Sequence, residues 1–261
     1  MGFLDFFKKK PKISEETKVY FSTNTKPEVV TTDVKSPETE TLVVTGIEDV
    51  KNLGFMFKFD RKKFYDGYRK YFGPMDSNLV KAMDTLLDQI EKDDRFRAAK
   101  DVRTPRRQLA YCLATFKWET AHTMRPIKEY GGAAYFNKRY GPQTRVGKQL
   151  GNIKPGDGAR FCGRGFVQLT GRSNYAKASK FVGVDLIANP EKACNPDIAY
   201  RIATEGMIEG WFTGKKLSNY FVDGKLPLWE QARRIINGMD KASKIASIAR
   251  QFDEILVVSL V

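Results

Sequence analysis

One segment, Ala159-Arg-Phe-Cys-Gly-Arg-Gly-Phe-Val-Gln-Leu-Thr-Gly-Arg-Ser-Asn-Tyr175, restricts the folds open to this chain more than any other. Gly163, Gly165 and Gly171 allow tight turns and let the backbone approach a ligand closely. The residues around them supply amides, a hydroxyl, arginines and an aromatic ring. Such groups bond to hydroxyls and acetamides and stack on apolar sugar faces. The segment therefore predicts a carbohydrate-contacting lobe with a small hairpin around 161–169.

The rest of the chain from residue 57 onward predicts helices. Capping signals place helix starts at Ser77, Thr104-Pro105, Asn195-Pro196 and Asp240. Apolar residues then recur at helical spacing, and the second of these helices is expected to bury Leu109, Cys112, Leu113 and Phe116. Residues 125–175 are rich in glycine, proline and basic residues and are expected to form long loops. The pattern predicts a mainly α fold with one irregular, glycine-rich lobe.

Composition divides the chain at about residue 56. Residues 11–45 are rich in Thr, Ser, Pro, Glu and Lys without periodicity, so residues 1–56 are expected to be a flexible tether. The apolar and basic tip of this segment is interpreted as a disordered end, with docking to virion proteins or to a membrane as the alternative. Residues 57–261 are expected to form the catalytic domain.

Charge is concentrated in residues 57–261. Residues 1–56 hold 8 lysines and 9 acidic residues, which leaves 37 basic and 22 acidic residues for the remainder, a net charge of +15. A domain this basic attracts anionic polymers, either nucleic acid or bacterial cell wall. The basic residues are not interleaved with aromatics along one element, which argues against nucleic acid.

The cysteines and the single histidine limit the chemistry. Cys112, Cys162 and Cys194 cannot all pair and show no metal-binding spacing, so reduced cysteines in a cytoplasmically made protein are expected. His122 is the only histidine, so a zinc amidase or peptidase lacks its usual ligands. An amidase that uses one cysteine and one histidine stays open. No metal and no cofactor is expected.

Glu119 is the candidate general acid. It follows Phe116 by three residues and Cys112 by seven, so helical spacing places it on the buried face. A carboxylate at the edge of an apolar face is desolvated, and its pKa should rise, as a general acid requires. The alternative is a solvated glutamate in a fraying last turn.

Together with Trp118-Glu-Thr-Ala-His122, the segment 159–175 resembles the glycoside hydrolase 19 family, the chitinase-like lysozymes that include many phage endolysins. The resemblance covers about residues 57–261 and implies a lysozyme-like helical fold. It also implies that Glu119 is the catalytic acid. Trp118 stands where the family usually has histidine, and a core position is expected for its ring.

The resemblance also implies the rest of the site. Inverting glycosidases need a second carboxylate as base; Glu129 is the best candidate, with Asp157 as the rival. The resemblance implies that Thr170 holds the attacking water and that Gln168, Asn174 and Asn237 contact sugar. Tyr135 and Tyr175 are candidate stacking platforms. Arg164 is expected to be an internal brace that is buried with a carboxylate.

These observations predict a monomeric peptidoglycan hydrolase that cleaves β-1,4 bonds of glycan strands by an inverting two-carboxylate mechanism. The alternatives are a chitinase, a lytic transglycosylase that uses only Glu119, and a non-catalytic wall-binding protein of a virion. Without a visible signal peptide, synthesis in an infected bacterial cytoplasm and action on the cell wall are expected, after release at lysis or by carriage in the virion.

Overall fold

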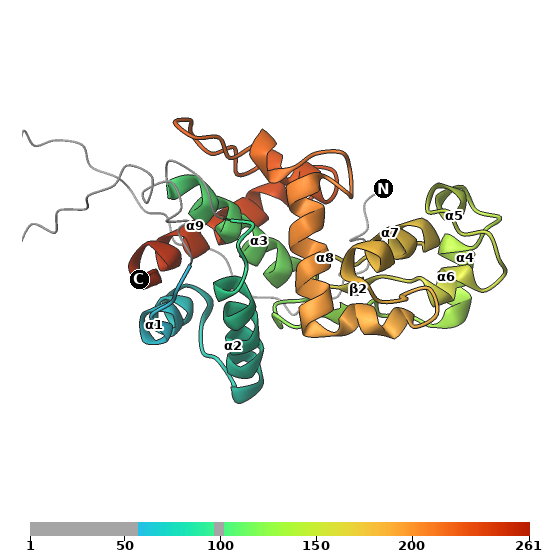
Figure 1. The fold of residues 1–261 in the computed structure, drawn as a ribbon, viewed down its shortest axis with the longest axis horizontal. Coiled ribbons are helices and arrows are strands. Elements are labelled where there is room, and N and C mark those ends of the chain that lie inside the picture. Colours follow the sequence, from blue (N-terminus) through green and yellow to red (C-terminus); the bar gives the residue numbers. More distant parts are fainter. Residues whose placement is uncertain (1–56, 97–101) are drawn as a thin grey trace, which may run out of the picture. The chain divides into compact units, whose positions relative to one another are not determined.

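A computed structural model describes residues 57–96 and 102–261 (Figure 1). The predicted tether, residues 1–56, lies outside the described residues. Within them the protein is mainly helical, which confirms the expected lysozyme-like fold class. No helix in the described ranges is both long and apolar enough to span a membrane.

The described elements are mostly helices. The α-helices are α1 (Arg61–Phe72), α2 (Ser77–Glu91), α3 (Arg103–Glu119), α4 (Ala133–Tyr140), α5 (Arg145–Gln149), α6 (Asp157–Arg160), α7 (Arg172–Val182), α8 (Pro196–Glu209) and α9 (Ala242–Ser259). Short 3-10 helices are η3 (Pro190–Cys194), η4 (Leu217–Asn219) and η5 (Gln231–Ile235). The strands are β1 (Ile127–Lys128) and β2 (Arg164–Gly165).

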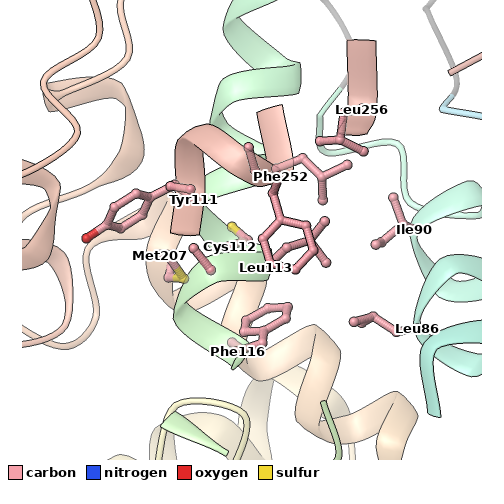
Figure 2. Close-up of a cluster of buried hydrophobic side chains, with 14 of the residues drawn as sticks. Leu86, Ile90, Tyr111, Cys112, Leu113, Phe116, Met207, Phe252 and Leu256 are labelled. Atoms are coloured by element: carbon pink, nitrogen blue, oxygen red, sulfur yellow. The ribbon is translucent and has the colours of Figure 1, made fainter. Parts of the chain in front are cut away.

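Helix α3 lies in the main hydrophobic core and packs along α9. Figure 2 shows its side chains among those of α2, α8 and α9. The four residues expected on its buried face are confirmed there, each with no exposed surface: Leu109, Cys112, Leu113 and Phe116. Burying one large apolar side chain contributes roughly 1.5–3 kcal/mol, so this face holds the C-terminal end of α3 firmly in place.

Two of the four predicted helix starts agree closely with the structure. The Asn195 side chain caps α8 by accepting hydrogen bonds from two backbone N–H groups. Helix α2 begins at Ser77, but Asp76 makes the capping bond. Helix α3 begins at Arg103 without a side-chain cap, so Thr104 lies inside the first turn, and α9 begins two residues after Asp240.

The expected long-loop region, 125–175, contains more helix than predicted. Helices α4, α5 and α6 lie there, and in Figure 1 they group with α7 on one side of α8. The predicted hairpin is present as a tight bridge between Arg164 and Leu169, and β2 also pairs antiparallel with β1. Helix α4 forms because Phe136 and Tyr140, one turn apart, both bury their rings.

Candidate active site

Glu119 is the last residue of α3. Its expected place on the buried face is confirmed, since only 8% of the residue is exposed. Its Oε1 accepts a hydrogen bond from Nη1 of Arg233 at 2.7 Å. Burial raises the pKa of Glu119, and the charge and hydrogen bond of Arg233 offset only part of that rise. A carboxyl whose pKa is raised in this way has the property that a general acid needs.

Arg233 is a site residue that the sequence did not reveal. It lies on η5 with only 1% of its surface exposed, and its Nε donates to the backbone oxygen of Asp240 at 3.2 Å. Its neighbour Arg234 is exposed. Nothing in the pattern Gln231-Ala-Arg-Arg-Ile235 distinguishes the two arginines, and the partner carboxylate is 114 residues away.

Glu129 follows β1 directly and is held by three polar contacts. Its Oε1 accepts from the hydroxyl of Tyr140 at 2.9 Å, and its Oε2 accepts from the N–H of Gly163 at 3.1 Å. The backbone N–H of Glu129 donates to the oxygen of Gly163 at 2.8 Å. The carboxylate is half-buried, so it is fixed in direction and still reached by solvent. Tyr140 is a second residue that the sequence did not reveal.

The glycine at position 163 is required by the site itself. A Cβ atom there would lie 2.7 Å from Oε1 of Gln168 and 3.2 Å from Oε2 of Glu129. The Nε2 of Gln168 donates to the backbone oxygens of Ile127 and Gly165, which turns its Oε1 toward this point. Gln168 also has a positive φ of 55°, a strained conformation of the kind that clusters at functional sites. The structure therefore brings Gln168 and Glu129 together.

Thr170 and Asn174 continue the same segment. The Oγ1 of Thr170 donates to the backbone oxygen of Gln168 at 2.8 Å, so its lone pairs can still accept from a water molecule. The Nδ2 of Asn174 donates to the backbone oxygen of Thr170 at 2.8 Å. Asn174 is half-buried and lies in the first turn of α7. These bonds fix both side chains relative to Gln168.

Asp157, the rival base, is a structural residue. It is 2% exposed and accepts from the backbone N–H groups of Ile153 and Lys154 and from Nε and Nη2 of Arg172. Burial alone would raise its pKa, but these bonds outweigh it and lower the pKa to about 2. A carboxylate that already accepts four hydrogen bonds and has a lowered pKa is poorly suited to deprotonate water.

Two predictions for residues 159–175 are wrong, namely that Tyr175 stacks on a sugar and that Arg164 pairs with a carboxylate. Tyr175 has no exposed surface, packs against Phe161 and donates its hydroxyl to the oxygen of Cys162, so its ring cannot stack on a sugar. Arg164 is an internal brace as expected, but its described partners are not carboxylates. Its Nη1 donates to the oxygens of Arg160 and Cys162 and to the hydroxyl of Tyr175.

Tyr135 lies six residues after Glu129, and Asn237 lies four residues after Arg233, the partner of Glu119. Tyr135 is half-buried on α4, and its hydroxyl accepts from Nη1 of Arg139 at 2.9 Å. Asn237 is half-buried two residues after η5, and its N–H donates to the oxygen of Arg233. Sugar contacts by these two residues stay predictions.

The segment after Glu119 is strained. Ala121, His122 and Met124 all have positive φ although none is glycine. Trp118 packs against the core as expected, and its indole Nε1 is buried without a hydrogen-bond partner. Backbone strain of this kind persists where the surrounding structure holds it, and here it lies in the stretch of sequence between Glu119 and Glu129.

Within 57–96 and 102–261, no three His, Cys, Asp or Glu side chains could hold a metal ion.

The sequence profile of the family described as chitinase class I, glycoside hydrolase 19, matches residues 77–220, more than half of the chain. The chain belongs to glycoside hydrolase family 19. The matched range contains Glu119, Glu129, Gln168, Thr170 and Asn174. Arg233 and Asn237 lie beyond it.

Relatives and solved structures agree with this family. The chain is 30% identical to Chitinase 11 of Oryza sativa subsp. japonica over 166 residues, which is 58% of this chain and 59% of the relative. It is 29% identical to Endochitinase 2 of Gossypium hirsutum over 112 residues, 41% of this chain and 37% of the relative. The chain thus spans less than two thirds of the length of these relatives. Chitinase C from Streptomyces griseus shares the fold, with a TM-score of 0.50 at 21% identity over 76% of this chain and 91% of that one.

Proposed function

We propose that this family 19 protein is a peptidoglycan hydrolase that cleaves β-1,4 glycosidic bonds with inversion. The observation that carries the proposal is the contrast between two carboxylates. Glu119 is buried with a raised pKa, whereas Glu129 is half-buried and oriented by Tyr140 and the N–H of Gly163. Environments that differ in this way suit an acid and a base. Family membership supports the class of reaction.

In the proposed reaction Glu119 gives its proton to the glycosidic oxygen as the bond to C1 breaks. The charge of Arg233 then stabilises the carboxylate that remains. Glu129 takes one proton from a water molecule that donates its other O–H to Oγ1 of Thr170. The hydroxyl adds to C1 from the opposite face of the ring, which inverts the anomeric centre. Exchange with solvent returns a proton to Glu119 and removes one from Glu129.

Charge supports a bacterial wall as the substrate. Residues 57–261 carry a net charge of +15, and peptidoglycan carries stem-peptide carboxylates and attached anionic polymers. Chitin is nearly neutral and gains little from such a domain. Chitin is nevertheless the second candidate, because the similar plant proteins are named chitinases and endochitinases.

The proposal includes a phage-type setting. The enzyme would be made in an infected cell and reach the wall after membrane lysis or within a virion. Fractionation of an infected culture tests this setting. Recovery with purified virions supports carriage in the particle, whereas appearance only in the late lysate supports release at lysis.

Mass spectrometry of the products from purified sacculi tests the function. Reducing ends that carry one added water, formed by the wild type and not by Glu119→Gln, are expected. Anhydro sugar ends would instead indicate a lytic transglycosylase. Cleavage of chitin oligomers alone would indicate a chitinase. Binding to sacculi without cleavage of either substrate would indicate a wall-binding protein.

A further inference from the structure

Glu129 and Thr170 are linked by a chain of hydrogen bonds through the end of α4 and the start of α7. The first bond runs from the hydroxyl of Tyr140, the last residue of α4, to Oε1 of Glu129. The backbone oxygen of Tyr140 accepts from Nδ2 of Asn152 at 2.7 Å. The Oδ1 atom of Asn152 accepts from the backbone N–H of Arg172 at 2.8 Å, two residues after Thr170. One tyrosine and one asparagine therefore connect the two residues that would handle the attacking water.

Tyr140 presents its hydroxyl in a fixed direction. Only 2% of the residue is exposed, its ring is stacked with that of Phe136, and the guanidinium carbon of Arg139 lies 5.4 Å from its ring centroid. Burial and the charge of Glu129 raise the pKa of Tyr140, so the hydroxyl keeps its proton and acts as a donor at neutral pH. With the N–H of Gly163 on Oε2, each carboxylate oxygen of Glu129 has a fixed partner.

Asn152 is a buried polar side chain between α5 and α6, with 2% of its surface exposed. The chain before it is pressed between the end of α4 and the start of α7. A Cβ atom on Gly147 would lie 2.5 Å from the oxygen of Tyr140, and one on Gly151 would lie 1.8 Å from Oγ of Ser173. Because the backbone is packed so closely on both sides, the carboxamide of Asn152 fixes the spacing of the two helices.

Neither Tyr140 nor Asn152 is open to a sugar, since each is buried. Packing alone would be met by apolar side chains, whereas a buried carboxamide is costly unless its hydrogen bonds are made. Both printed bonds of the Asn152 side chain go to backbone groups of residues next to or within the site. Any effect of these two residues on the reaction must therefore pass through the groups that they hold.

We infer that Tyr140 and Asn152 are positioning residues that hold the carboxylate of Glu129 at a fixed distance from the hydroxyl of Thr170. The inference rests on the proposed role of Glu129 as the base. Proton transfer requires the water on Thr170 to lie within hydrogen-bond reach of the carboxylate. A misplacement of about 1 Å is enough to lower a rate about 10²-fold, so the spacing matters even though neither side chain touches the substrate.

Steady-state kinetics test the inference, on purified sacculi or on chitin oligomers if only those are cleaved. Tyr140→Phe removes the hydroxyl and keeps the ring, and it should lower kcat about tenfold or more while KM stays within about twofold. Asn152→Ala should lower kcat in the same way. The matched controls are Tyr71→Phe, which removes a hydroxyl that donates to Glu254, and Asn195→Ala, which removes the cap of α8. Both controls should keep the wild-type kcat.

A double-mutant cycle separates positioning from a general structural role. In the Glu129→Gln background, with azide present as the nucleophile, adding Tyr140→Phe should change turnover by less than about twofold, because no base is left to position. A merely structural effect would instead lower turnover by the same factor in both backgrounds, and that result would overturn the inference.

Carboxyl ¹³C NMR reports on the same contacts without a substrate, so it tests the inference even if the protein cleaves no glycan. The Glu129 signal, assigned by its loss in Glu129→Gln, should move in Tyr140→Phe and in Asn152→Ala, whereas the Glu119 signal should stay in place. Tyr140→Phe keeps the test valid if Asn152→Ala fails to fold. An unchanged kcat in Tyr140→Phe, or a Glu129 signal that does not move, would overturn the inference.

Discussion

The helical part of the molecule and the glycine-rich segment place their carboxylates by different physical means. Glu119 sits at the end of a helix that is buried mostly through apolar side chains, and the one described bond of its carboxylate is to Arg233. Glu129 follows the two-residue strand β1, and bonds from Tyr140 and Gly163 orient its carboxylate. Burial raises the pKa of Glu119, whereas hydrogen bonds fix the direction of the Glu129 carboxylate.

This difference predicts different responses to substitution. A change at Glu119 should alter proton donation without disturbing the fold, since the surrounding core holds α3 in place. A change at the groups that hold Glu129 should disturb geometry, since a few hydrogen bonds orient that carboxylate. The predictions below separate the two behaviours, from the largest expected effect to the smallest.

Glu119→Gln should reduce the rate of glycan cleavage by about 10³-fold or more, because general acid catalysis contributes roughly 10²–10⁴-fold. The thermal midpoint should stay near that of the wild type, since the amide keeps the shape and can still meet Arg233. Rates on purified sacculi and circular dichroism melts measure the two quantities. Activity within tenfold of the wild type would remove Glu119 from the role of acid.

Glu129→Gln should reduce the rate by about 10²-fold or more, because the base is lost while its shape is kept. Added azide should restore part of the turnover, since a small anion can attack without a base. Product analysis would show the glycosyl azide. The matched control is Asp157→Asn, which should stay active at temperatures below its unfolding; the reverse pattern would give the base role to Asp157.

Asp157→Asn should lower stability more than activity. The folded-state pKa of Asp157 is about 2, below its ordinary value of 3.8, so its ion pair stabilises the fold above pH 4. The shift corresponds to roughly 2 kcal/mol at neutral pH. Urea unfolding should show this difference in the free energy of unfolding between the wild type and the variant at pH 7. The difference should shrink as the pH falls from about 4 to about 2. A difference that stays constant over that range would contradict the assignment.

Lys117→Met should leave cleavage unchanged and raise stability at pH 7. Lys117 is 6% exposed and donates to the hydroxyl of Tyr68, and burial lowers its pKa to about 8. The unfolded chain therefore holds a proton that the folded protein releases between about pH 8 and 10, so wild-type stability should rise over that range. Urea unfolding should show no such rise in the variant. Lys81→Met, at an exposed position, is the control.

Local patterns predicted the helical part well and the polar contacts poorly. The buried face of α3 followed from helical spacing, and the cap of α8 followed from Asn195-Pro196. Arg233 could not be found in this way, because an arginine 114 residues from its partner looks like any surface arginine. Such pairs are set by tertiary packing, which no local window contains.

In the glycine-rich segment 159–175, a functional role was predicted for a residue that belongs to the core. Tyr175 was expected at the sugar because it ends a polar motif, yet it is fully buried. Its spacing to Ala178 and Val182, three and seven residues on, is the helical pattern of a core face. Helical periodicity was therefore the better guide to this aromatic residue, and the same periodicity at Phe136 and Tyr140 would have predicted α4.

The central claim is that burial outweighs Arg233 and raises the pKa of Glu119. A ¹³C NMR titration of protein labelled at the glutamate side-chain carboxyl carbons tests it, with the Glu119 signal assigned by its loss in Glu119→Gln. We predict a midpoint clearly above the ordinary glutamate value of about 4.3. In Arg233→Gln the midpoint should rise further, whereas Arg234→Gln should leave it unchanged. A wild-type midpoint at or below the ordinary value would contradict the account.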